Sequence, residues 1–336
     1  MEYFDPACLT FRQHFAGSGA MSAILIPVQG SEEVVEVPLS EIAEMDPNDV
    51  IDILQGEMAS LDLWLRFAIE YYKQGNTDAF QTLLEPLVEL HNQPSQSMGV
   101  PNLLHEQFGN DRAVKNQYLH ILNALAAFHM TNGSRSRDMV TRKAEFETAK
   151  KYYDSAEAVD MLSTSMHVGQ AMLLLAKGEA AQAEKILESV RQPSASEGVP
   201  ALLARASAKF NAGEVKAALK LYREAFQANP NPPPSVRLGL AYCFAVLGHP
   251  QLARKALLRT LELQEDCVEA MSGLAALYLN EDRVREALEL LQRAYRLEPD
   301  NPGVLNLLAS HHFYKGQYDK AHKLANKAFL NSASAA

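Results

Sequence analysis

Two adjacent histidines, His311 and His312, come nearest in type and spacing to a metal or acid–base site. They lie in an apolar stretch that predicts a helix, and neighbouring residues on a helix point about 100° apart. The two rings therefore do not both face one metal ion. Phe244, Tyr278 and His312 are evenly spaced along the chain. We interpret His312 as a packing residue at a position that otherwise carries an aromatic ring.

No other arrangement of reactive side chains matches a catalytic or metal site. The sequence contains no Gly-rich phosphate loop, HExxH, GxSxG or paired CxxC motif. Cys8, Cys243 and Cys267 share no ligand or redox spacing, which fits a reducing compartment. Carboxylates such as Glu262 and Glu265 are interpreted as solvated surface. We therefore predict no enzyme activity, no cofactor and no metal site.

The elements that would position functional side chains repeat along the chain. Glycine or aspartate turns recur at nearly constant steps, with an alanine at a fixed distance after each turn. The turns are Gly178, Gly213, Gly248, Asp282 and Gly316, and the alanines are Ala183, Ala218, Ala253, Ala287 and Ala321. A period of about 34 residues is typical of tetratricopeptide (TPR) repeats, in which each unit is a pair of helices.

Apolar residues inside each unit recur three and four positions apart, which predicts helices with one buried face. Leu203, Ala206 and Phe210 show this spacing before the turn at Gly213. Glycine suits such a turn because it adopts positive φ without a steric penalty. The predicted fold is all-α: a right-handed α-solenoid of about seven TPR helix pairs, with a short N-terminal β-hairpin or extended segment.

The hairpin prediction comes from β-forming residues after Ala23, where Pro27 and Pro38 exclude a central sheet position. We expect loops at Asn92–Val114 and Pro193–Gly198, and a stretched turn at Thr131–Arg137. The predicted parts are a flexible extension (residues 1–20), the hairpin and a lead helix (21–58), two irregular TPR units with long loops (59–160), five regular units (161–330) and a tail (331–336).

Composition limits the classes of partner. A formal net charge of −10 gives no reason to expect a direct grip on nucleic acid phosphates. The sequence contains no apolar run long enough to cross a membrane as a helix, and no basic region followed by an apolar core at its N-terminus. We expect a soluble, intracellular protein that does not insert into membranes.

The inner face of the first helices is the predicted partner groove, if these helices face inward as in other repeat arrays. Its candidate residues are Met172, Phe210, Tyr242, Asn280, Asn306, Ser310 and Phe313. Such a mixture suits an extended or helical segment anchored by apolar side chains, although several of these residues could instead contact the next repeat. Val168, Met172, Leu203 and Ser207 replace the basic residues that a clamp for acidic chaperone tails needs.

One run near the N-terminus is not generic repeat sequence. It contains Asp52-Ile53-Leu54, Glu57, Leu61-Asp62-Leu63-Trp64-Leu65 and Glu70-Tyr71-Tyr72-Lys73-Gln74-Gly75. This run, marked by Trp64, Tyr71 and Tyr72, resembles the N-terminal region of the large TPR scaffold subunit of the polymerase-associated factor (PAF) complex. Asn306–Phe313 fits the Asn-x-Leu-Ala-Asn-His-Phe-Phe pattern of that family, with Ser310 and His312 as departures.

The resemblance covers about residues 21–330 and implies a platform on which the other PAF subunits assemble. It implies a nuclear protein that links elongating RNA polymerase II, directly or through those subunits, to histone monoubiquitination and methylation. The alternatives are a general TPR adaptor of the co-chaperone or sorting type, and an enzyme that carries repeats as a targeting arm. Because no polar capping helix follows Leu330, we also expect a fragment or a truncated form.

Overall fold

The computed structural model describes residues 23–28, 34–42, 44–95, 102–109, 111–136, 138–189, 198–229 and 232–333. These residues form two compact units, which are described separately below. The N-terminal unit comprises the described residues of 14–128 and 149–166, and the C-terminal unit those of 129–148 and 167–336. The extension predicted at residues 1–20, together with Cys8, lies outside the described part of the chain.

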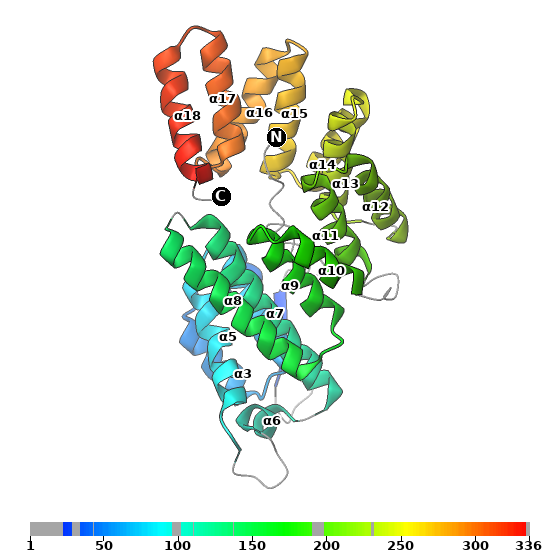
Figure 1. Cartoon of the computed structure of the whole chain (residues 1–336). Coiled ribbons are helices and arrows are strands. Elements are labelled where there is room, and N and C mark those ends of the chain that lie inside the picture. Colours follow the sequence, from blue (N-terminus) through cyan, green and yellow to red (C-terminus); the bar gives the residue numbers. More distant parts are fainter. Residues whose placement is uncertain are drawn as a thin grey trace. The chain divides into compact units, whose positions relative to one another are not determined.

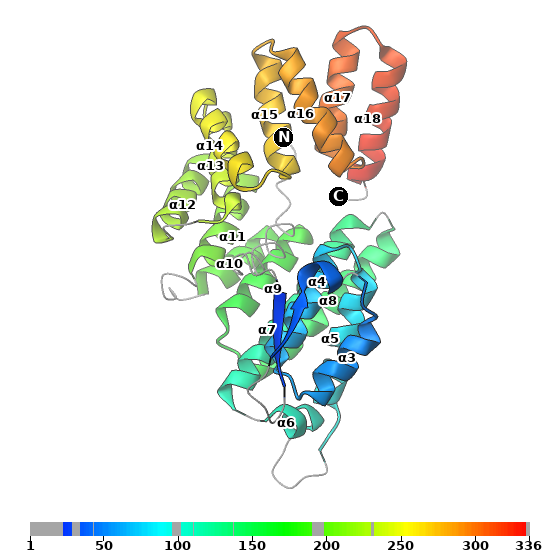
Figure 2. The ribbon, with the colours of Figure 1, turned by 180° about the vertical axis from the view of Figure 1, so that it is seen from behind.

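A β-hairpin opens the N-terminal unit, as the sequence predicts (Figure 2). Strand β1 (Ala23–Pro27) pairs antiparallel with β2 (Val34–Pro38), and Ile24 lies opposite Val37. Ile24 and Val37 are buried on one face of the hairpin, because side chains alternate between the faces of a strand. Two short helices follow, α2 (Leu39–Ile42) and α3 (Pro47–Gly56).

Seven antiparallel helix pairs make up most of the described residues, which confirms the all-α repeat fold (Figure 1). The pairs are α4 (Leu61–Lys73) with α5 (Thr77–Asn92), α7 (Arg112–Arg135) with α8 (Met139–Val159), α9 (Thr164–Ala176) with α10 (Ala180–Ser189), α11 (Gly198–Asn211) with α12 (Val215–Ala228), α13 (Pro234–Val246) with α14 (Pro250–Leu263), α15 (Val268–Asn280) with α16 (Val284–Leu297), and α17 (Pro302–Tyr314) with α18 (Tyr318–Ala333). From α10 to α18 in the C-terminal unit, each helix contacts the next one along the chain.

Side-chain caps fix several helix starts. The Asn301 side chain accepts hydrogen bonds from the backbone N–H groups of Gly303 (2.9 Å) and Val304 (3.3 Å) at the start of α17. Asn76 caps α5 in the same way, at 3.0 Å from the N–H of Ala79. Each cap satisfies N–H groups that have no partner within the helix, so these polar residues determine where the helices begin.

The turn between the two helices of a pair has the backbone geometry that the sequence predicts. Gly178, Gly213, Gly248 and Gly316 have φ between 73° and 83°, and Asp282 has a φ of 58° at the equivalent position. Positive φ is a left-handed conformation that most residues avoid because of their Cβ atom.

Small residues allow the helices to approach closely. The alanines after the turns are buried: Ala183, Ala218, Ala253 and Ala287 are 0% exposed and Ala321 is 6% exposed. Gly239 in α13 lies so close to the buried ring of Tyr222 in α12 that an added Cβ would overlap the ring. The contact between these neighbouring pairs therefore requires glycine.

The structure corrects two loop predictions. The expected loop at Asn92–Val114 contains a further helix, α6 (Leu103–Phe108), which starts at an Asn102 cap and buries Leu104 completely. The stretched turn expected at Thr131–Arg137 is helical as far as Arg135. The helix continues through Gly133, and glycine is required there because a Cβ would lie 2.7 Å from the ring of Phe146 in α8.

Helix α18 continues to Ala333. The loop expected at Pro193–Gly198 falls almost entirely outside the described residues, and α11 begins at Gly198.

Candidate partner-binding surface

The first helices of the repeats carry the predicted groove residues. In the C-terminal unit α11 contacts α13, α13 contacts α15 and α15 contacts α17, so these helices form a continuous row. Asn280 is exposed at the end of α15, and Asn306, Ser310 and Phe313 are exposed on α17. These four candidates are therefore accessible to a partner.

Phe210 and Tyr242 are brought together by the stacking of α11 on α13. Their ring centroids are 6.5 Å apart, and both side chains are half-buried. The Tyr242 hydroxyl donates a hydrogen bond to the backbone oxygen of Glu269 at 3.2 Å, which joins α13 to α15. Both rings therefore support packing between repeats and offer only part of their surface to a partner.

Met172 is not accessible, contrary to the prediction. Its side chain in α9 is 2% exposed, because it packs in the interior of the unit. Val168, Leu203 and Ser207, which were also expected on inward-facing surfaces, are buried at 2%, 2% and 0% exposure. Helical periodicity identified the apolar face of these helices, but this face is buried in the folded chain.

An aromatic cluster at the last described turn was not predicted. Phe313, Tyr314 and Tyr318 are 57%, 88% and 63% exposed, and the Phe313 ring lies 6.0 Å from Tyr314 and 5.4 Å from Tyr318. The sequence signal was the presence of tyrosines on both sides of the positive-φ Gly316. Exposed aromatic residues are enriched at protein–protein interfaces, so this cluster extends the candidate surface.

The residues near the N-terminus that carry the PAF resemblance form part of a hydrophobic core. Trp64 and Tyr71 are 1% and 0% exposed, and the Tyr71 hydroxyl donates to the backbone oxygen of Met45 at 3.0 Å. Burial raises the pKa of Tyr71, and Asp46 and Asp49 raise it further. The Tyr72 ring packs edge-on against Phe128 of α7, with centroids 6.0 Å apart. These residues thus hold the N-terminal unit together.

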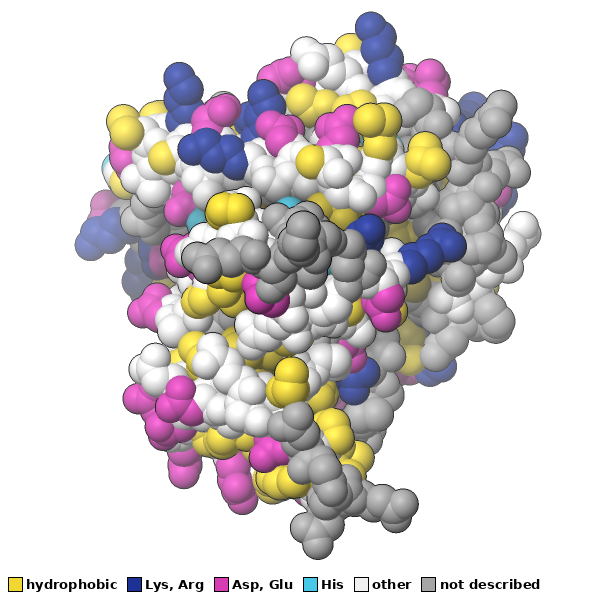
Figure 3. All heavy atoms as spheres, turned by 90° about the horizontal axis from the view of Figure 1, so that it is seen from below, with side chains coloured by type: hydrophobic (Ala, Val, Ile, Leu, Met, Phe, Trp, Pro, Cys, Tyr) yellow, Lys and Arg dark blue, Asp and Glu magenta, His cyan; other side chains and the backbone are white. Residues whose placement is uncertain are grey.

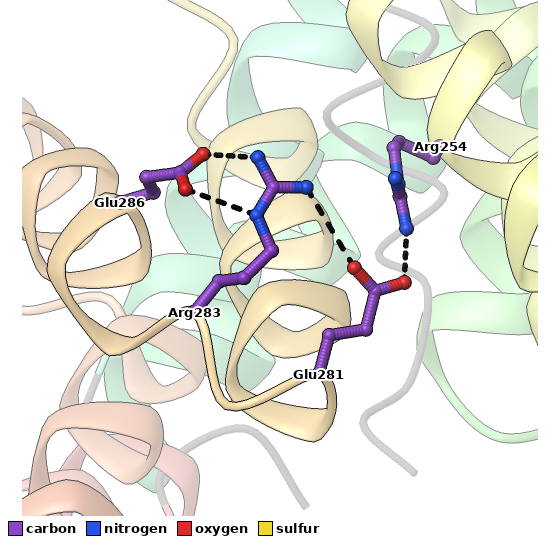
Figure 4. Close-up of polar contacts among 4 residues, drawn as sticks. All are labelled: Arg254, Glu281, Arg283 and Glu286. Atoms are coloured by element: carbon purple, nitrogen blue, oxygen red, sulfur yellow. Dashed lines mark hydrogen bonds and ion pairs between the residues drawn. The ribbon is translucent and has the colours of Figure 1, made fainter.

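Several basic side chains along the repeats are engaged in ion pairs. Arg283 at the α15–α16 turn bonds Glu286 and lies 3.7 Å from Glu281, which also pairs with Arg254 of α14 (Figure 4). The hydrogen bond from Arg283 lowers the pKa of Glu286. The Arg283 guanidinium also lies 4.1 Å from the centre of the Tyr278 ring.

This network joins two consecutive repeats. A clamp that binds carboxylates needs basic side chains that are not already paired with acidic residues of the same chain. Lys209 in α11 is similarly paired, with Glu184 at 2.6 Å and Glu214 at 3.2 Å.

The histidine pair has a different environment from the one expected. His311 is the buried member, at 8% exposure, and burial together with Lys315 and His312 lowers its pKa. His312 is half-buried, with its Nδ1 atom 2.8 Å from Oε1 of Gln317. His312 thus lies nearer the surface at the end of α17, so the packing role belongs to His311.

Within the described ranges, no three His, Cys, Asp or Glu residues are grouped closely enough to hold a metal ion. The described helices likewise include none that is long and apolar enough to span a membrane. Acidic, basic and apolar side chains are interspersed on the face shown in Figure 3.

Comparison with known proteins agrees with the repeat geometry. A tetratricopeptide repeat family model matches residues 210–278 and 278–333. The crystal structure of a tetratricopeptide repeat protein from Parabacteroides merdae aligns with a TM-score of 0.50 and 13% identity, over 80% of this chain and 91% of that one. The fold and the repeat pattern define the chain as a TPR protein.

The sequence relatives indicate a narrower family than the general TPR match does. The chain is 36% identical over 311 residues to "Protein CTR9 homolog" of Arabidopsis thaliana, covering 92% of this chain and 27% of that protein. It is 29% identical over 312 residues to "RNA polymerase-associated protein CTR9" of Caenorhabditis elegans, covering 90% and 26%. Over most of its length the chain is homologous to the CTR9 proteins, which confirms the resemblance to the TPR subunit of the PAF complex. It spans about a quarter of the length of these relatives.

A shorter match involves an enzyme. "Protein O-mannosyl-transferase TMTC1" of Homo sapiens is 31% identical over 120 residues, which cover 36% of this chain and 13% of that protein. This likeness extends over a much smaller share of the chain than the CTR9 similarity.

Proposed function

We propose that the chain is part of a scaffold subunit of a PAF-type complex, which binds sister subunits and associates with RNA polymerase II in the nucleus. The single observation that carries this proposal is the 36% identity to a CTR9 protein over 92% of the chain. Stacked TPR pairs suit this role because each repeat adds surface while contacting mainly its neighbours. Through its partners the scaffold links elongation to histone monoubiquitination and methylation.

The proposed role requires no catalysis by this chain. The described residues are occupied by helix pairs and a small hairpin, and the candidate surface carries aromatic and amide groups. The TMTC1 similarity extends over 36% of the chain, so it supports an enzyme less than the CTR9 match supports a scaffold. A general adaptor for acidic tails is the second candidate, but the pairing of Lys209, Arg254 and Arg283 with carboxylates disfavours it.

Affinity purification tests the scaffold role. The tagged chain is expressed in cells depleted of their own CTR9 protein, and captured proteins are identified by mass spectrometry. Sister PAF subunits and RNA polymerase II subunits are expected. Capture of chaperones or sorting cargo without them would support the general adaptor instead.

A surface variant tests the groove. We propose that Phe313, with Asn280 and Asn306, contacts a partner segment. Phe313→Ala should reduce capture of at least one sister subunit by about fivefold, since loss of an exposed aromatic anchor costs about 1 kcal/mol or more.

The helical circular dichroism of Phe313→Ala should stay unchanged because the side chain is 57% exposed. Leu263→Ala, at 42% exposure on the second helix α14, is the matched control. Undiminished capture by Phe313→Ala with an intact fold would reject the groove assignment.

A further inference from the structure

The second strand of the hairpin is exposed along most of its length. Val34, Val35 and Glu36 are exposed, with 51% of Val34 and 47% of Val35 accessible, although these three residues point to alternate faces. In β1, Ile24 and Ile26 are buried at 7% and 1% exposure, whereas Leu25 is 54% exposed. Among the described residues β2 pairs only with β1, so its other edge has no strand beside it.

An exposed strand edge offers a row of N–H and C=O groups that can pair with another extended chain. Folded proteins usually protect such edges with lysine, proline, a bulge or a covering element. In β2 the proline comes at the end, at Pro38, and Val34 and Val35 occupy the exposed part. Valine favours strand pairing, because its branched side chain packs well on a pleated surface.

The stretch of sequence that contains this edge is acidic. No lysine or arginine occurs between Arg12 and Arg66, whereas ten acidic residues do. Of these, Glu36 lies in β2 itself, and Glu41 and Glu44 follow it at exposed positions in and after α2. A basic segment complements this surface. A second copy of the chain does not, because edge pairing between copies would bring their Glu36 side chains together.

We propose that the edge of β2 binds an extended, lysine- or arginine-rich segment of a partner protein as a third strand. Backbone hydrogen bonds to β2 supply affinity, and alternate side chains supply specificity. A basic residue of the segment pairs with Glu36 on one face, and a β-branched residue packs beside Val35 on the other face. The proposal depends on neither the repeat groove nor the CTR9 similarity, because it concerns the hairpin of the N-terminal unit.

A designed peptide tests this directly with the full chain. The probe is a fluorescently labelled peptide of alternating lysine and valine, and the comparison peptide has proline in place of each valine. Binding is followed by fluorescence anisotropy, and hydrogen–deuterium exchange identifies the protected amides. We expect the lysine–valine peptide to bind and to slow exchange within residues 34–38. The proline peptide, which has the same charge but lacks those N–H donors, should bind at least about tenfold more weakly.

Charge variants locate the site. Glu36→Lys should weaken binding of the lysine–valine peptide by about fivefold or more, since it replaces an attraction by a repulsion. Val35→Lys should act in the same direction, because an edge lysine disfavours strand addition. Glu188→Lys on α10 makes the same change in net charge at an exposed position of the C-terminal unit and should change affinity by less than about twofold. Circular dichroism checks that each variant is folded.

Four results would overturn the proposal. These are no binding by the lysine–valine peptide, equal binding of the two peptides, amide protection confined to residues outside 34–38, and sedimentation of a dimer that Glu36→Lys alters. The second result would mean that charge alone attracts the probe, and the last that a second copy occupies the edge.

Discussion

At the scale of single residues, close packing sets a stricter requirement than the apolar pattern. Gly239 and Gly273 occupy equivalent positions in α13 and α15, one repeat apart. A Cβ on Gly239 would overlap the ring of Tyr222, whose hydroxyl lies 3.2 Å from Ser207 Oγ in the interior. A Cβ on Gly273 would be 3.4 Å from Leu257, an ordinary contact distance. Packing therefore requires glycine at position 239 but not at position 273.

This difference gives a matched pair of variants. Gly239→Ala should lower the free energy of unfolding by about 1–3 kcal/mol, because Tyr222 must leave its buried position. Gly273→Ala should be neutral or stabilising by up to about 1 kcal/mol, because alanine favours helix and meets no obstacle. Urea denaturation of both variants measures the effects. Equal stability changes would show that the Tyr222 ring moves aside at little cost.

At the scale of elements, turn conformation determines where one helix ends and the next begins. Gly213 and Asp282 both have positive φ after the first helix of a pair, at 83° and 58°. Only glycine adopts this conformation without a Cβ penalty, and aspartate tolerates it better than most residues. The repeat therefore keeps its geometry although one turn lacks glycine.

Alanine substitution should affect the stability of these two turns differently. Gly213→Ala should destabilise the chain by about 1–2 kcal/mol, since it forces a Cβ into the left-handed region. Asp282→Ala should cost less, about 0.5 kcal/mol, because the native residue already carries that Cβ. Thermal unfolding followed by circular dichroism provides the comparison. A larger loss for Asp282→Ala would assign the aspartate side chain a bonding role that backbone strain does not explain.

At the scale of the whole molecule, both units bury groups that ionise only in alkaline solution. Burial raises the pKa of the Cys243 thiol from 9.0 to about 12. Burial also raises the pKa of Tyr222 in the C-terminal unit and of Tyr153 in the N-terminal unit. Each group is neutral in the native state, so its contribution to stability is complete below its ordinary pKa and is lost as pH rises toward the native value.

The free energy of unfolding should consequently be level between about pH 7 and 8.5 and should fall above about pH 9, where unfolded Cys243 ionises. The thiol contributes a slope of about 1.4 kcal/mol per pH unit once the unfolded group is ionised. Cys243→Ala should reduce the slope between about pH 9 and 10. Urea titrations across this range check the expectation. An unchanged slope in the variant would show that the thiol reaches water in the native state.

The sequence by itself determined the repeat: the regular period, the positive-φ turns and the buried alanines follow from local spacing and backbone sterics. It also indicated the CTR9 resemblance through a run that includes Trp64 and Tyr71. Only the tertiary structure decided which face of each first helix stays open. Met172 and Phe313 both fit a groove pattern, but the folded chain buries Met172 at 2% exposure and leaves Phe313 57% exposed.

The same reason explains the remaining differences. Asn132-Gly133 is a turn signal in sequence, yet the helix α7 continues through it, and Gly133 makes room for the ring of Phe146, which packs where a Cβ would be. Helical periodicity specifies that a residue lies on an apolar face, but it does not specify which part of the chain covers that face. Burial depends on contacts between segments far apart along the chain, and only the assembled fold specifies those contacts.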